Sequence, residues 1–231
     1  GAVPAAPGTD GIMSNGAAGL RFDRDQAGRI LSLQAEVHEA RNGEPIHEPT
    51  PNPPYVIEVT PAQHFTGGFA IGRYEAPLPA GHALAVQANL SHERLQFPSI
   101  IDERRDVYTL EAQDRFSPLE SHDVVVGLSG VYDEDDITPS RFLVFDPASQ
   151  TRRTYRLFAQ DEIALFAGRA HLTAGAVLEH DNVTGTHGMP DLRLAITTSP
   201  TSTLWFAVSR ALRSPSRVER TVSFLLGPTI P

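Results

Sequence analysis

The sequence predicts an all-β protein: an antiparallel, up-and-down β-barrel of about ten strands, with short turns at one end and long loops at the other. Apolar and polar residues alternate with a period of two through most of the chain, which sorts side chains onto the two faces of a sheet. Short and long connections between the alternating segments follow one another in strict order. Aromatic residues gather near the ends of the segments.

The composition narrows the classes of partner and site. The chain has 231 residues, of which 40% are hydrophobic, so one large β domain is within reach. A formal net charge of −9 argues against a nucleic-acid partner, because no basic stripe is present to neutralise phosphates. Cysteine is absent, which excludes disulfides, thiolate catalysis and Cys-ligated zinc. The sequence shows neither a run of about 18 apolar residues nor the pattern of a signal peptide.

Two regions are predicted from their glycine and proline content. Residues 1–16 are rich in Gly, Ala and Pro, so we expect a disordered or extended segment before a single barrel domain at 17–231. Residues 39–63 contain six prolines, which lack the donor that a ladder needs, so we expect a loop.

The strands of the first half are predicted from alternation. The segment 82–92 is the clearest, with Leu84, Val86 and Leu90 opposite Ala85, Gln87 and Asn89. The strands expected in this half are 17–22, 29–38, 64–74, 82–92 and 106–116.

The second half repeats the pattern more strongly, and it predicts strands at 122–132, 155–165, 171–180, 192–197 and 204–210, with a possible short strand at 221–226. The apolar face collects Leu157, Ala159, Ile163, Leu165, Leu172, Ala174, Ala176, Leu178, Leu192, Leu194, Ile196, Leu204, Phe206 and Val208. The opposite face collects Arg156, Gln160, Glu162, Thr173, Glu179, Arg193, Thr197 and Ser209.

The connections and aromatics favour a barrel that crosses a membrane. Short turns are predicted at 23–28, 75–81, 117–121, 166–169 and 198–202, and long loops at 39–63, 93–105, 133–151 and 181–190. Aromatics near the turns are Tyr74, Phe116 and Phe166, and those near the loops are Tyr132 and Tyr155. Strands of about ten residues, short turns on one side and two aromatic girdles are typical of outer-membrane barrels.

One long run resembles a known family. It comprises 157–163 (LFAQDEI), 172–180 (LTAGAVLEH), Thr184-Gly185, 190–194 (PDLRL) and 203–217 (TLWFAVSRALRSPSR). This order is similar to that of TonB-dependent outer-membrane receptors, and the likeness extends more weakly over residues 17 to 220. The resemblance implies substrate uptake across the bacterial outer membrane, with lipid around the barrel, ligand capture by the long loops and passage through the lumen.

The chain also departs from that family. The family has a plug domain, a box that contacts an energy-coupling protein and a barrel of 22 strands, whereas this sequence shows neither of the first two and about half of the strands. The resemblance therefore implies a barrel portion, either part of a larger receptor or a smaller barrel, that alone acts at most as a passive pore. An open half-barrel exposes two edges, so we expect closure, pairing with another copy or a rearranged fold.

Several candidate sites are weighed against simpler interpretations. The acidic run at 133–136 lacks the glycine and closing glutamate of a calcium loop, so we expect a solvated loop. The nine histidines fit no metal-ligand spacing, and we expect no metal and no cofactor. Four arginines near the end of the chain fit a charged rim better than an anion site; they are Arg210, Arg213, Arg217 and Arg220.

Three short runs combine nucleophile, base and acid types: Ser91-His92-Glu93, Ser121-His122-Asp123 and His180-Asp181. Neighbours in a strand point to opposite faces and no GxSxG elbow is present, so we expect no enzyme, with a barrel hydrolase as one alternative. Another alternative is a soluble β-barrel that binds a small apolar ligand inside, because alternation does not reveal which face is enclosed. Asp161 and Glu162 are adjacent in a predicted strand, so one of the two carboxylates must lie on the apolar face with Leu157.

Overall fold

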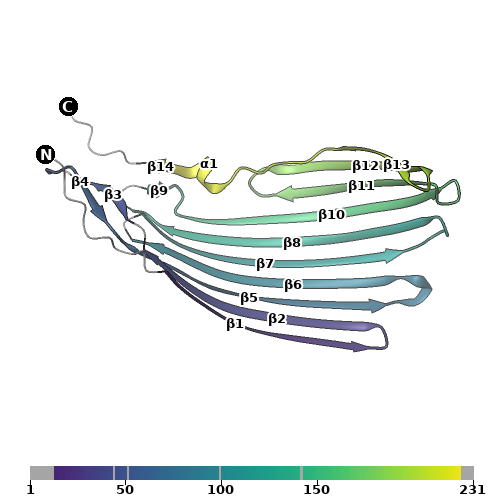
Figure 1. The fold of residues 1–231 in the computed structure, drawn as a ribbon, viewed down its shortest axis with the longest axis horizontal. Helices are drawn as coiled ribbons and strands as arrows, with labels where there is room; N and C mark the ends of the chain where they lie inside the picture. Colours follow the sequence, from purple (N-terminus) through teal and green to yellow (C-terminus); the bar gives the residue numbers. More distant parts are fainter. Residues whose placement is uncertain (1–12, 44, 51, 99, 141–142, 225–231) are drawn as a thin grey trace.

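A computed structural model describes residues 13–43, 45–50, 52–98, 100–140 and 143–224. Its main feature is a ten-stranded antiparallel sheet in which each long strand pairs with the next one along the chain (Figure 1). The strands, in sheet order, are β1 (Met13–Gln26), β2 (Arg29–Gly43), β5 (Ala62–Pro77), β6 (Ala83–Phe97), β7 (Ile101–Phe116), β8 (His122–Thr138), β10 (Ser149–Leu165), β11 (Ala170–Asp181), β12 (Gly185–Ser199) and β13 (Ser202–Ser209). The predicted all-β, antiparallel, up-and-down architecture is confirmed.

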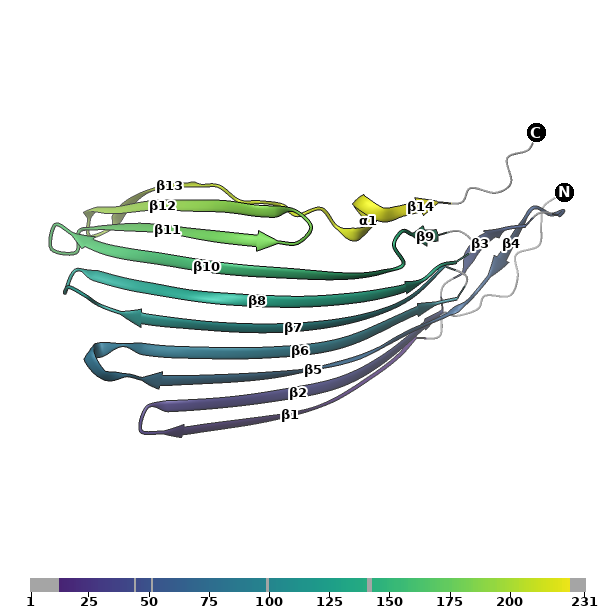
Figure 2. The same ribbon diagram turned by 180° about the vertical axis from the view of Figure 1, so that it is seen from behind.

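The remaining elements are short. β3 (Ile46–Pro49) and β4 (Val56–Val59) form a hairpin, and β9 (Leu143–Phe145) pairs with β14 (Val222–Phe224). The 3-10 helix η1 (Pro79–Gly81) lies in a turn, and α1 (Arg217–Thr221) precedes β14. Both views place these two short sheets beyond the same end of the large sheet (Figures 1 and 2). No helix in the described part of the chain has the length and apolar character needed to cross a membrane.

The long strands extend further than the sequence predicted at one end of the sheet. The predicted loops 93–105 and 181–190 are wrong, because strands cover most of both and leave connections at 98–100 and 182–184. Residues 13–16 belong to β1, and residues 1–12 lie outside the described residues. Polar residues hold these extensions together: Arg94 pairs with Asp102 at 3.0 Å, and Arg105 with Asp133 at 2.7 Å.

A turn lies at each of the five predicted short connections, although residues 23–26 and 75–77 belong to β1 and β5. Between β1 and β2 the turn consists of two residues, Ala27 and Gly28, with φ angles of 55° and 75°. Positive φ at both positions matches the twist of the flanking strands, and glycine takes this conformation without strain. The turn at 166–169 likewise carries positive φ at Phe166, Ala167 and Gly168.

The sheet has little hydrophobic core of its own. Among the described residues, the buried apolar side chains are Ala76, Ile137, Phe145 and Ala170. Larger apolar side chains are exposed along the strands, and in the described residues no hydrogen bonds join the edge strands β1 and β13 to one another. A sheet with this surface needs an apolar environment or further protein against it, because large exposed apolar patches are rare on soluble monomers.

Candidate functional site

One face of the sheet is apolar and exposed. The register aligns Leu157 with Leu128 on β8 and Leu178 on β11, so the three share a face. Leu157 is 58% exposed, and on the edge strand Phe206 and Val208 are 61% and 67% exposed. The predicted set of apolar residues therefore does occupy one face, and no other part of the described chain covers it at these positions.

We call the end of the large sheet that carries the two short sheets the loop end, and the end that carries the short turns the turn end. Aromatic and charged residues border the apolar face at the loop end. The rings of Tyr108 and Tyr132 lie 6.1 Å apart, and the Arg153 guanidinium lies 5.7 Å from the centre of the Tyr132 ring. His92 and Asp106, aligned across β6 and β7 one step further out, pair at 2.7 Å. Amphipathic rings followed by charges mark the level where an apolar medium gives way to water.

Two carboxylates interrupt the apolar face near the turn end, and each has a histidine partner. Asp161 aligns with Val124 on this face and its Oδ2 lies 2.7 Å from His122 Nδ1, while Glu162 is on the other face. Asp114 lies 2.5 Å from His82, whose ring stacks on Phe116 at 4.7 Å. A hydrogen-bonded imidazole lowers the cost of a carboxylate beside apolar groups.

The opposite face carries a continuous polar row across nine strands. Each member is the direct cross-strand partner of the next, so their side chains stand side by side. In order from β1 to β12, the row is Asp23, Ser32, Arg73, Gln87, Glu111, Ser129, Arg156, Glu179 and His187. Its charged members alternate in sign from Asp23 to Glu179, and we call it the polar row.

Ion pairs link the polar row to its neighbours. Arg73 lies 2.6 Å from Glu75 and donates to Gln87 at 3.3 Å, while Arg156 lies 2.6 Å from Glu179. The Glu179 side chain is only 8% exposed, and Arg156 is its ion-pair partner. The row thus offers hydrogen-bond donors and acceptors in alternation. Sequence reasoning missed this row because its members come from nine separate segments that only the register aligns.

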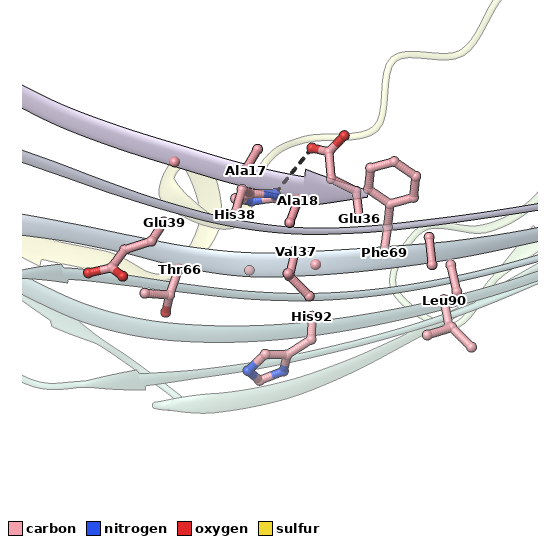
Figure 3. A pocket seen from close by; sticks show the side chains of 15 residues that line it. Ala17, Ala18, Glu36, Val37, His38, Glu39, Thr66, Phe69, Leu90 and His92 are labelled. Carbon is pink, nitrogen blue, oxygen red and sulfur yellow. Dashed lines mark ion pairs between the residues drawn. The ribbon is translucent and has the colours of Figure 1, made fainter. Parts of the chain in front are cut away.

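Glycine and alanine residues on β1, β2 and β5 have little or no side chain, and a hollow of about 870 Å³ lies over them. Figure 3 shows Glu36, His38 and Phe69 projecting from one side of the strands and Val37 and His92 from the other. A Cβ at position 67 would lie 2.8 Å from His38 Nε2 and 2.8 Å from the backbone carbonyl oxygen of His92, so a larger residue there would force a neighbour to shift. The hollow is therefore a consequence of small residues on neighbouring strands.

The C-terminal segment is held to the loop end of the sheet by an arginine. Arg217 forms an ion pair with Asp135, donates to the Ala148 carbonyl at 2.7 Å and lies 5.4 Å from the centre of the Phe145 ring. Arg220 donates to Gln150 at 3.1 Å. Arg217 and Arg220 thus bind side chains and carbonyls of the same chain, and the prediction of a charged rim stays a prediction.

Asp181 is the most buried charged residue of the described part. It lies at the last residue of β11, beyond the apolar face, and accepts hydrogen bonds from Arg152 at 2.5 Å and Thr154 at 2.8 Å. Burial alone would raise the pKa of this carboxyl, but these bonds and those from the amides of Val183 and Thr184 outweigh it and lower the pKa to about 2. The charge is therefore fixed at neutral pH and closes the turn between β11 and β12.

The acidic run at 133–136 lies in β8 and not in a loop. Asp133 pairs with Arg105 and Asp135 with Arg217, on the same face of the strand. Arginine partners occupy these carboxylates, which gives the run a structural role. Within the described residues, no three His, Asp or Glu side chains gather in a way that would hold a metal ion.

The three runs of nucleophile, base and acid types do not assemble in the described residues. His92 pairs with Asp106 on the apolar face, whereas Ser91 and Glu93 lie on the other. His122 pairs with Asp161, while Asp123 pairs with Arg115 on the opposite face. Among the hydrogen bonds of the described residues, none joins a serine hydroxyl to a histidine ring, and His180 instead lies 2.8 Å from the Thr186 hydroxyl.

Comparisons with known proteins find the fold among receptors. Neither a family model nor a curated protein matches the sequence. Among solved structures, the siderophore receptor PirA from Acinetobacter baumannii is similar, with a TM-score of 0.70 and 12% identity over 89% of this chain. PirA from Pseudomonas aeruginosa has a TM-score of 0.56 and 15% identity over 90% of this chain. The chain spans 34% and 43% of these two proteins, so it shares the fold of part of each.

Proposed function

We propose that this chain is a sector of an outer-membrane β-barrel of the TonB-dependent receptor type, and that it contributes to the uptake of a small polar solute. The observation that carries the proposal is the division of the sheet into an exposed apolar face and the polar row. In the proposed barrel, the apolar face meets lipid and the polar row lines the lumen. The likeness of fold to two siderophore receptors supports the same class of protein.

The height of the apolar face fits a bilayer. On β8, this face runs from His122 to Tyr132, which is ten residue steps. At about 3.3 Å per residue the span is about 33 Å, and a strand tilt of about 40° reduces it to about 25 Å. That is the height of the apolar band of outer-membrane barrels.

The two unpaired edges of the sheet are the places where further strands could complete a barrel. β1 and β13 each leave one side without a strand partner in the described residues, and such edges pair readily with other strands. We propose that further strands complete the barrel, since the neighbours are more than twice as long as the matched region. Pairing with a second copy of the chain uses the same edges. On its own, the sector supports passive passage and not energised uptake.

The alternative of a soluble barrel with an apolar interior requires the leucine face to be enclosed. Leu128, Leu157 and Leu178 are 53%, 58% and 51% exposed, so this face is open in the described structure. The exposure of these three side chains favours lipid as the medium that covers them.

The chain contains no cysteine, so single cysteines test the proposal without background. L128C places a label on the apolar face, and Q160C places a matched label on the polar face. After reconstitution into liposomes, an environment-sensitive dye at position 128 should be quenched by brominated lipid and shielded from iodide. The dye at position 160 should show the reverse. Iodide quenching at both sites would exclude the membrane barrel. A dye at position 128 that is shielded from both iodide and brominated lipid would support the soluble barrel, whose interior encloses this face.

A further inference from the structure

A second hollow, of about 450 Å³, lies at the turn end of the apolar face, on the first hairpin. It is lined by Arg24, Gln26, Arg29, Leu31 and Tyr74, with Ala27 and Pro77 at its end. The register confirms one face for these strand residues: Arg24 aligns with Leu31, Leu31 with Tyr74, and Gln26 with Arg29. The hollow therefore opens onto the same surface as the leucines.

The two arginines stand close together without an acidic partner. Arg29 is the direct partner of Gln26, and Arg24 donates to that glutamine at 2.7 Å. Arg24 and Arg29 are thus diagonal neighbours, at about 7–8 Å between such positions, which is within reach of long side chains, and their like charges repel. Within the described residues, neither guanidinium forms an ion pair, in contrast to Arg21, which pairs with Asp23 at 2.7 Å on the other face.

The nearby carboxylates all lie on the opposite face of the sheet. Asp25 aligns with Ile30 and Ile30 with Glu75, and this line lies one residue from the arginines on each strand. Glu75 is occupied by Arg73 at 2.6 Å. In the described residues, the hairpin thus places two arginines that have no acidic partner on the same face as the leucines, next to the ring of Tyr74.

We propose that this hollow binds the phosphate of a phospholipid headgroup at the boundary of the membrane. Arginine guanidinium forks match phosphate oxygens with two parallel hydrogen bonds, and two forks around one phosphate remove their mutual repulsion. Leu31 and the ring of Tyr74 supply apolar contact for the glycerol and the first methylenes of the lipid chains. The inference rests on the proposed function, because it takes the leucine face to meet lipid.

A lipid fits the hollow better than a free anion does. A free phosphate would gain only the two guanidiniums, which are exposed and lose much of their attraction to water and salt. The combination of charge at the tip and apolar residues behind it matches a headgroup whose chains continue along the leucine face. The shared chemistry is the phosphate, and the experiment separates the two sources.

The test compares R24Q/R29Q with R21Q in the full chain. In detergent micelles, native mass spectrometry titrations with phosphatidylglycerol measure the bound lipid, with inorganic phosphate and diacylglycerol as separate probes. The double variant should bind phosphatidylglycerol at least about tenfold more weakly, since it loses two charge-assisted contacts, and R21Q should match the parent chain. Phosphate alone and diacylglycerol alone should each bind at least about tenfold more weakly than the lipid.

Two results would overturn the inference: equal lipid binding by R24Q/R29Q and the parent chain, or phosphate binding as tight as that of the lipid. R24K/R29K keeps the charge without the fork and should bind with intermediate affinity, and circular dichroism confirms that each variant retains its strands. The dye at position 128, read in liposomes of the same variants, separates the two proposals. If the dye at position 128 lies in lipid but phosphatidylglycerol binding does not depend on Arg24 and Arg29, the lipid-headgroup inference is wrong and the proposed function stands. If the dye lies in water, the proposed function is wrong.

Discussion

Replacing Leu128 with arginine places a charge near the middle of the proposed lipid-facing band, and its cost is calculable from the strand. On β8, Leu128 lies four residues from Tyr132 and six from His122, the two borders of the apolar face. At about 3.3 Å per residue and a tilt of about 40°, these separations are about 10 Å and 15 Å of depth. An arginine this deep on the lipid face costs about 2–4 kcal/mol of folding free energy. Its direct partners Leu157 and Ala112 are apolar, and the diagonal neighbour Asp114 already lies 2.5 Å from His82.

The matched control is Q160R, which puts the same arginine on the polar face of the adjacent strand. Gln160 is exposed, lies opposite Gly175 and Val125, and has the carboxylate of Glu162 two residues away on the same face. We expect its folding free energy to change by less than about 0.5 kcal/mol. Urea titration of refolding in liposomes, followed by gel mobility, measures both variants. Equal losses for L128R and Q160R, or no loss for L128R, would refute the assignment of faces.

Three further predictions concern single sites. D181N should lower stability by about 2 kcal/mol at pH 7, because the carboxylate accepts four hydrogen bonds. The pKa of Asp181 is depressed, so the parent's advantage over D181N should be complete above about pH 4 and disappear as pH falls through 2 in unfolding measurements. G127V should cost about 1–3 kcal/mol, since a Cβ there would meet the Phe158 ring and lie 2.7 Å from a backbone carbonyl; F158A in the same chain should recover part of the loss. We propose that the chain is not an esterase: a chromogenic ester should show no turnover, and activity abolished by S121A would contradict this.

The centres of the strands were predictable, and their ends were not. Alternation identifies a strand wherever one face is apolar, as at 155–165 in β10. The part of each strand that the sequence reveals is therefore the part that carries the proposed lipid-facing residues. Beyond it both faces are polar, and the segment 93–105 has the composition of a loop although cross-strand ion pairs keep it in β6 and β7. The sequence could have revealed α1, because Ser216 and Glu219 form a capping box with the S-x-x-E spacing. The polar row could not be found without the register.

The register also gives an argument that alternation cannot supply. Following direct partners from Leu20 on β1, the line passes through Ala35, Ala70, Leu90, Tyr108 and Tyr132 to Arg153 on β10. It begins within the apolar face, crosses the aromatic border and ends on a charge. The band therefore slides along the strands from one side of the sheet to the other, so the strands are tilted relative to it. Tilt and stagger are what closing a sheet into a barrel requires, whereas a flat sheet on a membrane surface would keep its apolar residues at one level of the ladder. The slide across seven strands is thus an independent reason to place this sheet in the wall of a barrel.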